Sequence, residues 1–210
     1  MAIAPETSND LILPVVPRTR TIKLARMVSN VFCPPLLATA GILLVAAQIN
    51  SLGAWFWSSF IFLSGIISPL SFILFQLKKG KVSDFEIYHR EQRKGSYIFT
   101  MVCGTVSVIV MWLFAAPILL LILAAAAVIQ VLIMSLINTR WKISAHAASM
   151  GLFVTLLIYL YGHTMLPTTV GIPLMVWSRV RLHRHTLLQT IAGTILGISI
   201  LAVCLSMLQY

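Results

Sequence analysis

Charged side chains are scarce in this sequence, and acidic ones are the scarcest. Only 10% of the 210 residues are charged, with 5 Asp and Glu against 15 Lys and Arg. A soluble domain carries about 25% charged residues, so the composition excludes an ordinary soluble protein. Cysteine is also rare. The 3 cysteines lie in apolar stretches without CxxC spacing, and we interpret them as small hydrophobic residues within helices.

Charge is absent from four long stretches of the chain, at 27–77, 95–139, 143–178 and 185–210. A helix needs about 20 apolar residues to cross a hydrocarbon core about 30 Å thick. The first two stretches are long enough for two spans each, the third for two short ones and the fourth for one. We therefore expect an all-α, polytopic transmembrane helix bundle of six to seven spans.

The polar segments divide the chain into an arm and one membrane domain. Residues 1–28 are expected to form a polar arm with a basic end and no cleavable signal peptide. Residues 29–210 are expected to form a single transmembrane domain. Its spans are expected near 31–49, 54–76, 97–114, 118–137, 146–161, 168–178 and 185–208. Pro34 and Pro35 suit the beginning of the first of these helices.

Threading the chain through a membrane places every polar segment on one side. All 15 Lys and Arg fall in 1–28, 78–96, 138–144 and 179–184, and the loops expected on the other side carry none. Lys and Arg in short loops mark the cytoplasmic side. We expect a multi-pass protein of a bacterial-type inner membrane or an organelle membrane, with its charged face in the cytoplasm. Topology and anion binding then explain the net charge of +10, without nucleic acid.

Arginine and histidine recur in these polar segments and at their edges. The guanidinium group presents a fork of donors that matches phosphate oxygens, and histidine exchanges a proton near neutral pH. Phosphoryl transfer can use one histidine to attack phosphorus and another to protonate the leaving oxygen. The alternative is a set of positive-inside loops with incidental histidines. The residues concerned are Arg90, Arg93, Lys142, Arg179, Arg181, Arg184, His89, His146, His183 and His185.

Two short patterns favour the phosphate interpretation. Ser178-Arg179 is followed after five residues by His185 and after three more by Gln189, while Ser144-Ala145-His146 stands at the head of a predicted span. In order and spacing they resemble the third and second motifs of the PAP2 superfamily, the type 2 phosphatidate phosphatases. That family includes lipid phosphate phosphatases and undecaprenyl diphosphate phosphatases. The resemblance covers residues 78–200 and implies a PAP2-like helical core.

The resemblance also implies roles for the matching residues. His185 is implied to be the nucleophile that forms a phosphohistidine, and His146 the general acid for the leaving group. Arg179 is implied to bind phosphate, and Ser144 to donate further hydrogen bonds to it at a helix N-terminus. Gln189 stands where the family has an Asp. At i+4 from His185, its amide oxygen can orient the ring but supplies no negative charge.

The first PAP2 motif is not preserved in the segment 78–96. Arg90 and Arg93, three residues apart, are expected to bind phosphate in its place. Lys142 is a candidate to supply the charge of the missing lysine.

Two functions from different classes remain open at the level of sequence. The first is a membrane phosphatase that uses no metal and no cofactor, and that hydrolyses a lipid phosphate or diphosphate monoester of the phosphatidate or prenyl diphosphate type. Its headgroup would enter the basic site while the tail stays in the bilayer between helices, and no obligate protein partner is expected. The second is a catalytically impaired PAP2-like protein that binds or translocates a phosphorylated lipid. Gln189 and the altered first motif motivate this second hypothesis.

Overall fold

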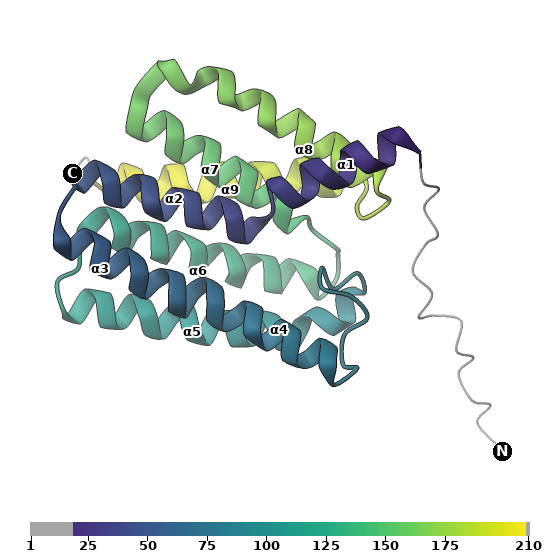
Figure 1. Ribbon diagram of the computed structural model, residues 1–210, viewed down its shortest axis with the longest axis horizontal. Coiled ribbons are helices and arrows are strands. Elements are labelled where there is room, and N and C mark those ends of the chain that lie inside the picture. Colours follow the sequence, from purple (N-terminus) through teal and green to yellow (C-terminus); the bar gives the residue numbers. More distant parts are fainter. Residues whose placement is uncertain (1–18, 209–210) are drawn as a thin grey trace.

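The computed structural model describes residues 19–208, and within that range it contains helices and loops but no strands. Five helices are long and apolar enough to cross a membrane, and a sixth is added if a bent pair near the N-terminus counts as one span. The protein is therefore an integral membrane protein built of helices, as its composition predicted. Figure 1 shows most of them lying side by side along one long axis.

The end of the predicted polar arm is helical. Helix α1 (Arg20–Val31) buries Ile22, Ala25 and Val28, which stand three residues apart on one face. This face packs on α8 (Gly171–Arg181). The boundary predicted between residues 28 and 29 therefore falls inside a helix. The sequence did not reveal this helix, because the basic residues on its exposed face make its composition look like that of a polar tail. Residues 1–18 of the arm lie outside the described range.

The first predicted span is shorter than expected. Helix α2 (Pro34–Ile49) begins three residues after Val31 and carries its two prolines in its first turn, where a proline costs no hydrogen bond. The break between α1 and α2 bends the chain by 41°. Asn50 then takes a left-handed conformation, with φ 49°, and ends α2 in a tight turn.

The next three membrane passes alternate in direction (Figure 1). The first joins α3 (Leu52–Ile61), the π-helical segment η2 (Phe62–Ile67) and α4 (Ser68–Lys78). The others are α5 (Arg93–Leu113) and α6 (Ile118–Asn138). Each lies within a few residues of its predicted bounds. The short helix η3 (Arg90–Gln92) leads the loop after α4 into α5.

The short segment predicted at 168–178 is a helix that returns the chain to the end of the bundle where α7 (Ala145–Tyr161) begins. Helix α7 runs from one end of the bundle to the other. The 3₁₀-helical segment η4 (Gly162–Val170) then reverses the chain, and α8 runs back beside α7 (Figure 1). Helix α8, with 11 residues, is shorter than the 17-residue α7, and the later part of η4 makes up the rest of the return. The motif after α8 thus shares an end of the bundle with the start of α7.

Helix α9 (Leu187–Ser206) packs on α7 through glycines. Gly193 and Gly197 stand four residues apart and face the backbone of Ser144 and Ala148, so closely that a Cβ at Gly197 would overlap the Ala148 carbonyl oxygen. Such small-residue spacing lets membrane helices approach each other. It fixes the start of α9 against the start of α7.

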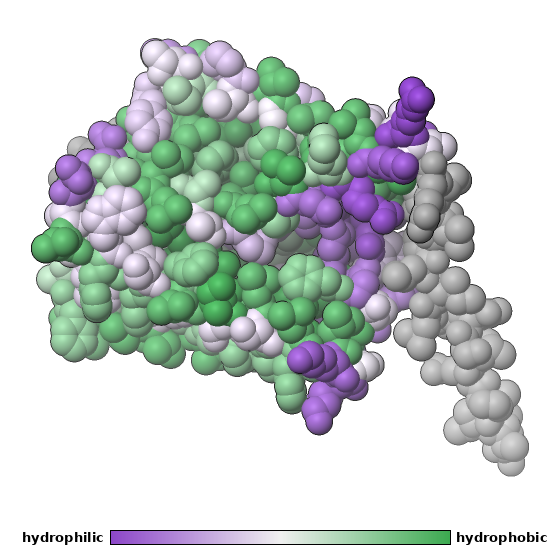
Figure 2. All heavy atoms as spheres, viewed as in Figure 1, coloured by the Kyte–Doolittle hydropathy of each residue, from purple (hydrophilic) through white to green (hydrophobic). Residues whose placement is uncertain are grey.

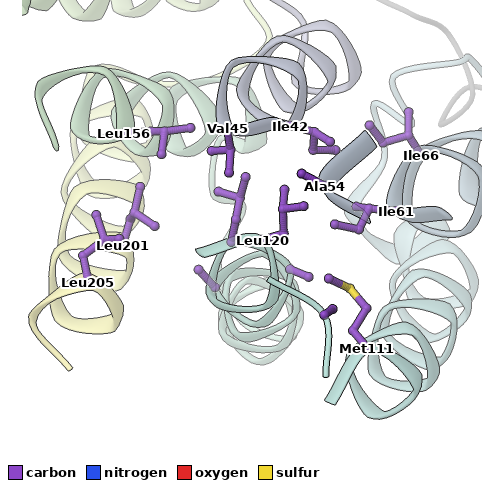
Figure 3. Close-up of a cluster of buried hydrophobic side chains, with 14 of the residues drawn as sticks. Ile42, Val45, Ala54, Ile61, Ile66, Met111, Leu120, Leu156, Leu201 and Leu205 are labelled. Carbon is purple, nitrogen blue, oxygen red and sulfur yellow. The ribbon is translucent and has the colours of Figure 1, made fainter. Parts of the chain in front are cut away.

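Apolar side chains fill the half of the bundle that lies toward the uncharged loops. Figure 3 shows Val45, Ala54, Met111 and Leu120 converging there from four helices. Leu201 joins them from α9. This apolar cluster closes that end of the bundle, so any internal space lies toward the charged end.

Candidate functional site

Charged side chains from distant segments meet at one end of the bundle. Figure 2 shows the hydrophilic side chains (purple) gathered at that end. Arg179 and Arg184 pair with Glu86 and Asp84 of the loop 79–89, and Arg181 donates to Thr21 of α1. The short links between passes therefore bring α1, the loop 79–89 and the α8–α9 connection together.

A cavity of about 610 Å³ begins among these charged groups and extends between the helices. Three charged side chains and two histidines line its polar end, and each comes from a different helix or loop. They are Glu86, Arg93, His146, Arg179 and His185. The rest of the wall is mostly apolar. Ligand-binding cavities commonly join a few convergent polar groups to an apolar wall in this way.

Arg179 is the most deeply buried cation at this end, with 2% of its surface exposed. It lies in the last turn of α8, where its charge also suits the helix dipole. Its Nη1 and Nη2 donate to the two carboxylate oxygens of Glu86, at 3.2 and 2.8 Å, and Nη1 also donates to the Ser29 hydroxyl. Its Nε is buried and has no partner in the described part of the chain. One donor of this buried guanidinium therefore makes no hydrogen bond within residues 19–208.

Glu86 occupies two of the donors of Arg179. Burial alone would raise the pKa of its carboxyl group, but the hydrogen bonds and the charge of Arg179 outweigh burial and lower the pKa to about 2. Arg184 adds a second contact, with Nε 3.4 Å from Oε2 of Glu86. Glu86 is thus a carboxylate at neutral pH, held by a forked pair of donors.

His185 is oriented by Gln189. Its Nδ1 lies 3.2 Å from Gln189 Oε1, and that oxygen also accepts the Thr186 backbone N–H at 3.1 Å. Because an N–H donates to the same atom, the atom must be an oxygen, so Nδ1 of His185 carries the proton. Nε2 is then the unprotonated nitrogen, and it is unoccupied by any bond in residues 19–208. Gln189 and Thr186 together form a capping box at the start of α9.

The surroundings of His185 keep its ring uncharged. Burial lowers its pKa, and the nearby Arg179, Arg93 and Lys142 lower it further, to about 2. A neutral imidazole with a free Nε2 is a nucleophile or a proton acceptor.

His146 lies in the first turn of α7 and also lines the cavity. Ser144 caps that helix, with its hydroxyl accepting from the Ala147 N–H at 3.4 Å, and its own N–H donates to the Gln189 carbonyl at 3.3 Å. Ser144 is fully buried and does not line the cavity. Its place in the structure is therefore that of a link between α7 and α9.

The three remaining predicted cations lie in different places. Arg93 lines the cavity and ties two loops together, donating to the carbonyls of Ile87 at 2.8 Å and Ile143 at 3.4 Å. Arg90 is half-exposed and turned away, bonded to Glu91 and to the Arg140 carbonyl. Of the two arginines predicted to bind phosphate from the segment 78–96, the structure brings only Arg93 to the cavity.

Lys142 lies beside the site rather than in the cavity wall. Its Nζ is 3.9 Å from the centre of the Tyr88 ring, at the distance of a cation–π contact. Burial lowers its pKa to about 8, and repulsion by Arg93 and Arg184 adds to the effect. Lys142 therefore contributes charge to the neighbourhood of His185 below about pH 8.

Sequence reasoning missed two residues that shape the site. Glu86 was not predicted as a site residue, although its position in the most basic internal segment of the chain was a signal that it could neutralise an arginine. Ser29 gives no such signal, because nothing in the sequence shows that it reaches a residue 150 positions away.

Within residues 19–208, no three His, Cys, Asp or Glu side chains are grouped closely enough to hold a metal ion. No family model, curated protein or solved structure matches the chain.

Proposed function

We propose that this protein is a PAP2-type membrane phosphatase that hydrolyses a lipid phosphate or diphosphate monoester without a metal. One observation carries the proposal. The buried Arg179 and two histidines line the polar end of one cavity that continues between membrane helices. Such an arrangement suits an anionic headgroup attached to an apolar tail.

The geometry supports a two-step reaction. Nε2 of His185 attacks phosphorus and forms a P–N bond while the bond from phosphorus to the leaving oxygen breaks, and His146, in its imidazolium form, gives that oxygen its proton and becomes neutral. Water then attacks the phosphohistidine, His146 takes a proton from the water, and the P–N bond breaks to release phosphate. Gln189 accepts from Nδ1–H throughout and holds Nε2 toward the substrate.

Arg179 and Arg93 hold the phosphoryl oxygens in this proposal. The Glu86 carboxylate accepts from Arg179 in the absence of substrate, so a bound phosphate would take the place of this carboxylate at the same two donors.

The proposed topology has six to seven spans, with this end of the bundle in the cytoplasm of a bacterial-type cell or facing the cytosol from an organelle membrane.

The test is phosphate release by the purified protein in the presence of EDTA, with hexadecyl phosphate, phosphatidate and a prenyl diphosphate as substrates. We expect His185→Ala to lower the rate by a factor of about 10³ or more, as loss of a nucleophile does. His163→Ala is the matched control, since His163 is exposed in η4 at the opposite end, and its rate should equal that of the unmodified protein. Equal rates for the two variants would rule out the proposed nucleophile.

A second function is favoured by one feature, the neutral Gln189 behind His185. A protein that only binds or translocates a phosphorylated lipid needs the anion site. It does not need a negative charge behind His185 to stabilise a cationic ring. This function is supported if no phosphate is released from any substrate, yet a phospholipid copurifies and Arg179→Ala abolishes its binding.

A further inference from the structure

The cavity reaches far beyond its charged end. Along α5 its wall runs from Arg93 to Ser107, which at 1.5 Å per residue is a depth of about 21 Å. One leaflet of a bilayer contributes about 15 Å of hydrocarbon. The cavity is therefore deep enough for a lipid chain of one leaflet's length.

The chemistry of the wall changes with depth. Hydroxyl groups of Ser96, Tyr97 and Ser149 lie within about one turn of the charged end. Most of the deeper wall is apolar, and the hydroxyl groups of Thr100 and Ser107 there donate to carbonyls of their own helix, which leaves Gln130 as a polar exception. The floor is formed by members of the apolar cluster, including Ile61, which also face the cavity. A charged end followed by a mostly apolar wall suits a phosphate attached to a hydrocarbon chain.

The cavity is bounded on its bilayer side by α2 and α4, which diverge toward the charged end (Figure 1). Figure 2 shows the surface hollowed there, beside the hydrophilic side chains and between apolar ones. A tail can therefore pass from the bilayer into the bundle without its headgroup crossing hydrocarbon.

The volume limits what fits inside. A methylene group fills about the 30 Å³ that a water molecule takes in the liquid, so 610 Å³ holds about 20 such groups. One chain of about 15 to 20 carbons fills this space, so the second chain of a phosphatidate would have to stay outside the cavity.

We propose that the bundle houses one hydrocarbon chain inside this cavity, so that the preferred substrates are lipid phosphates with a single tail of about 15 to 20 carbons. The inference rests on the proposed function for the headgroup end alone. It replaces the expectation that the tail stays in the bilayer.

Two small residues keep the deep part open. Ala127 of α6 lines the cavity about 16 Å below the end of its helix at Asn138, and its side chain is exposed. Gly65 of η2 also lines the cavity, and a Cβ added there would meet only Ile61, at 3.7 Å. Larger side chains at these positions should shorten the space without disturbing the charged end.

The experiment measures binding of alkyl phosphonates, whose P–C bond is not hydrolysed, to the full chain in nanodiscs. Hexadecylphosphonate should bind at least about tenfold more tightly than octylphosphonate, since each buried methylene is worth up to about fourfold. Ala127→Phe should reduce this ratio to about 2 or less and leave octylphosphonate affinity unchanged. Ile129→Phe is the matched control, because Ile129 is exposed on the same helix outside the cavity and should keep the full ratio.

Gly65→Leu repeats the test from another helix in case Ala127→Phe fails to fold. An unchanged chain-length ratio in a folded variant overturns the proposal, as does equal binding of a two-chain phosphonate analogue of phosphatidate. A geranylgeranyl phosphonate distinguishes a prenyl from an acyl preference. If the variants lose chain-length selectivity but the unmodified protein releases no phosphate, the tail site is supported and the catalytic proposal is overturned. If the unmodified protein releases phosphate but the variants keep their selectivity, the catalytic proposal is supported and the tail site is overturned.

Discussion

At the scale of single residues, Glu86 has two opposing effects. It neutralises the buried Arg179, and it would compete with the phosphate of the proposed substrate for the same donors. Glu86→Gln keeps the shape of the side chain and removes its charge. We expect a loss of about 1–3 kcal/mol of stability without an anion and about tenfold tighter binding of orthovanadate.

Thermal unfolding of the protein in detergent, with and without vanadate, checks both effects. Glu91→Gln is the control, since Glu91 is exposed and pairs with Arg90 away from the cavity. Weaker vanadate binding by Glu86→Gln would show that Glu86 positions Arg179 and does not compete with the ligand.

Gln189 sets the pH dependence of the proposed reaction. With a pKa of about 2, His185 stays neutral above that pH, so its protonation should not lower the rate between pH 8 and pH 5. Gln189→Glu places a carboxylate beside Nδ1, preserves the capping box and raises the pKa of His185. We expect about tenfold faster turnover at pH 7, because the cationic phosphohistidine is stabilised, and a fall in rate as the pH drops through the raised pKa.

The pH–rate profiles of the two proteins provide the measurement. Gln189→Leu, which loses the contact altogether, should be slower than the unmodified protein at every pH. A Gln189→Glu profile that remains flat on the acid side would show that His185 is not the group that reacts.

Which site residues the sequence could reveal depended on how far their partners lie along the chain. His185 and Gln189 are one helical turn apart, so their contact followed from spacing alone. Arg179 and His146 required the further inference that α8 returns to the end where α7 starts. The contacts of Arg179 with Glu86 and Ser29 join residues 93 and 150 positions apart, and no local pattern encodes them.

At the scale of elements, the lengths of the apolar runs predicted the bounds of α5, α6, α7 and α9 to within about four residues. The sequence did not predict α1, because a helix with few buried residues and many charges has the composition of a polar tail. The π-helical segment η2 was also missed. Its hydrogen bonds join residues five apart instead of four, and nothing in its apolar sequence distinguishes this pattern from that of a regular α-helix.

The approach of α7 and α9 is the element contact on which the site depends most. It sets Ser144 against Gln189 and so places His146 relative to His185. Gly197→Ala should force these helices apart, because the added Cβ meets backbone that cannot move aside. We expect a loss of stability of about 1–3 kcal/mol and a fall in phosphate release by a factor of about 10 or more.

Gly53→Ala is the control for this substitution. Gly53 also lies in a helix, but its added Cβ would meet only Ser51, at 4.0 Å, and Ala favours helix over Gly. Its stability should be unchanged or slightly higher. Equal thermal stability of the two variants would contradict the importance of the glycine contact.

At the scale of the whole molecule, the proposed orientation has a direct test. Single cysteines at Lys81 and Ser51 lie at opposite ends of the bundle, in a chain whose Cys33, Cys103 and Cys204 are replaced by alanine. With a membrane-impermeant maleimide, we expect the cysteine at position 81 to react only in inside-out vesicles and that at position 51 only in right-side-out vesicles. The reverse pattern would place the charged end outside the cytoplasm.

The hydrogen bond from Arg179 to Ser29 also bears on the order in which the protein is made. The two residues are 150 positions apart, and a ribosome adds about 5–20 residues per second. Synthesis of α8, the helix that covers the apolar face of α1, therefore follows that of α1 by about 8–30 s. During that interval the arginine that would bind the anion has not been synthesised, so a chain interrupted before α8 inserts into the membrane without this site.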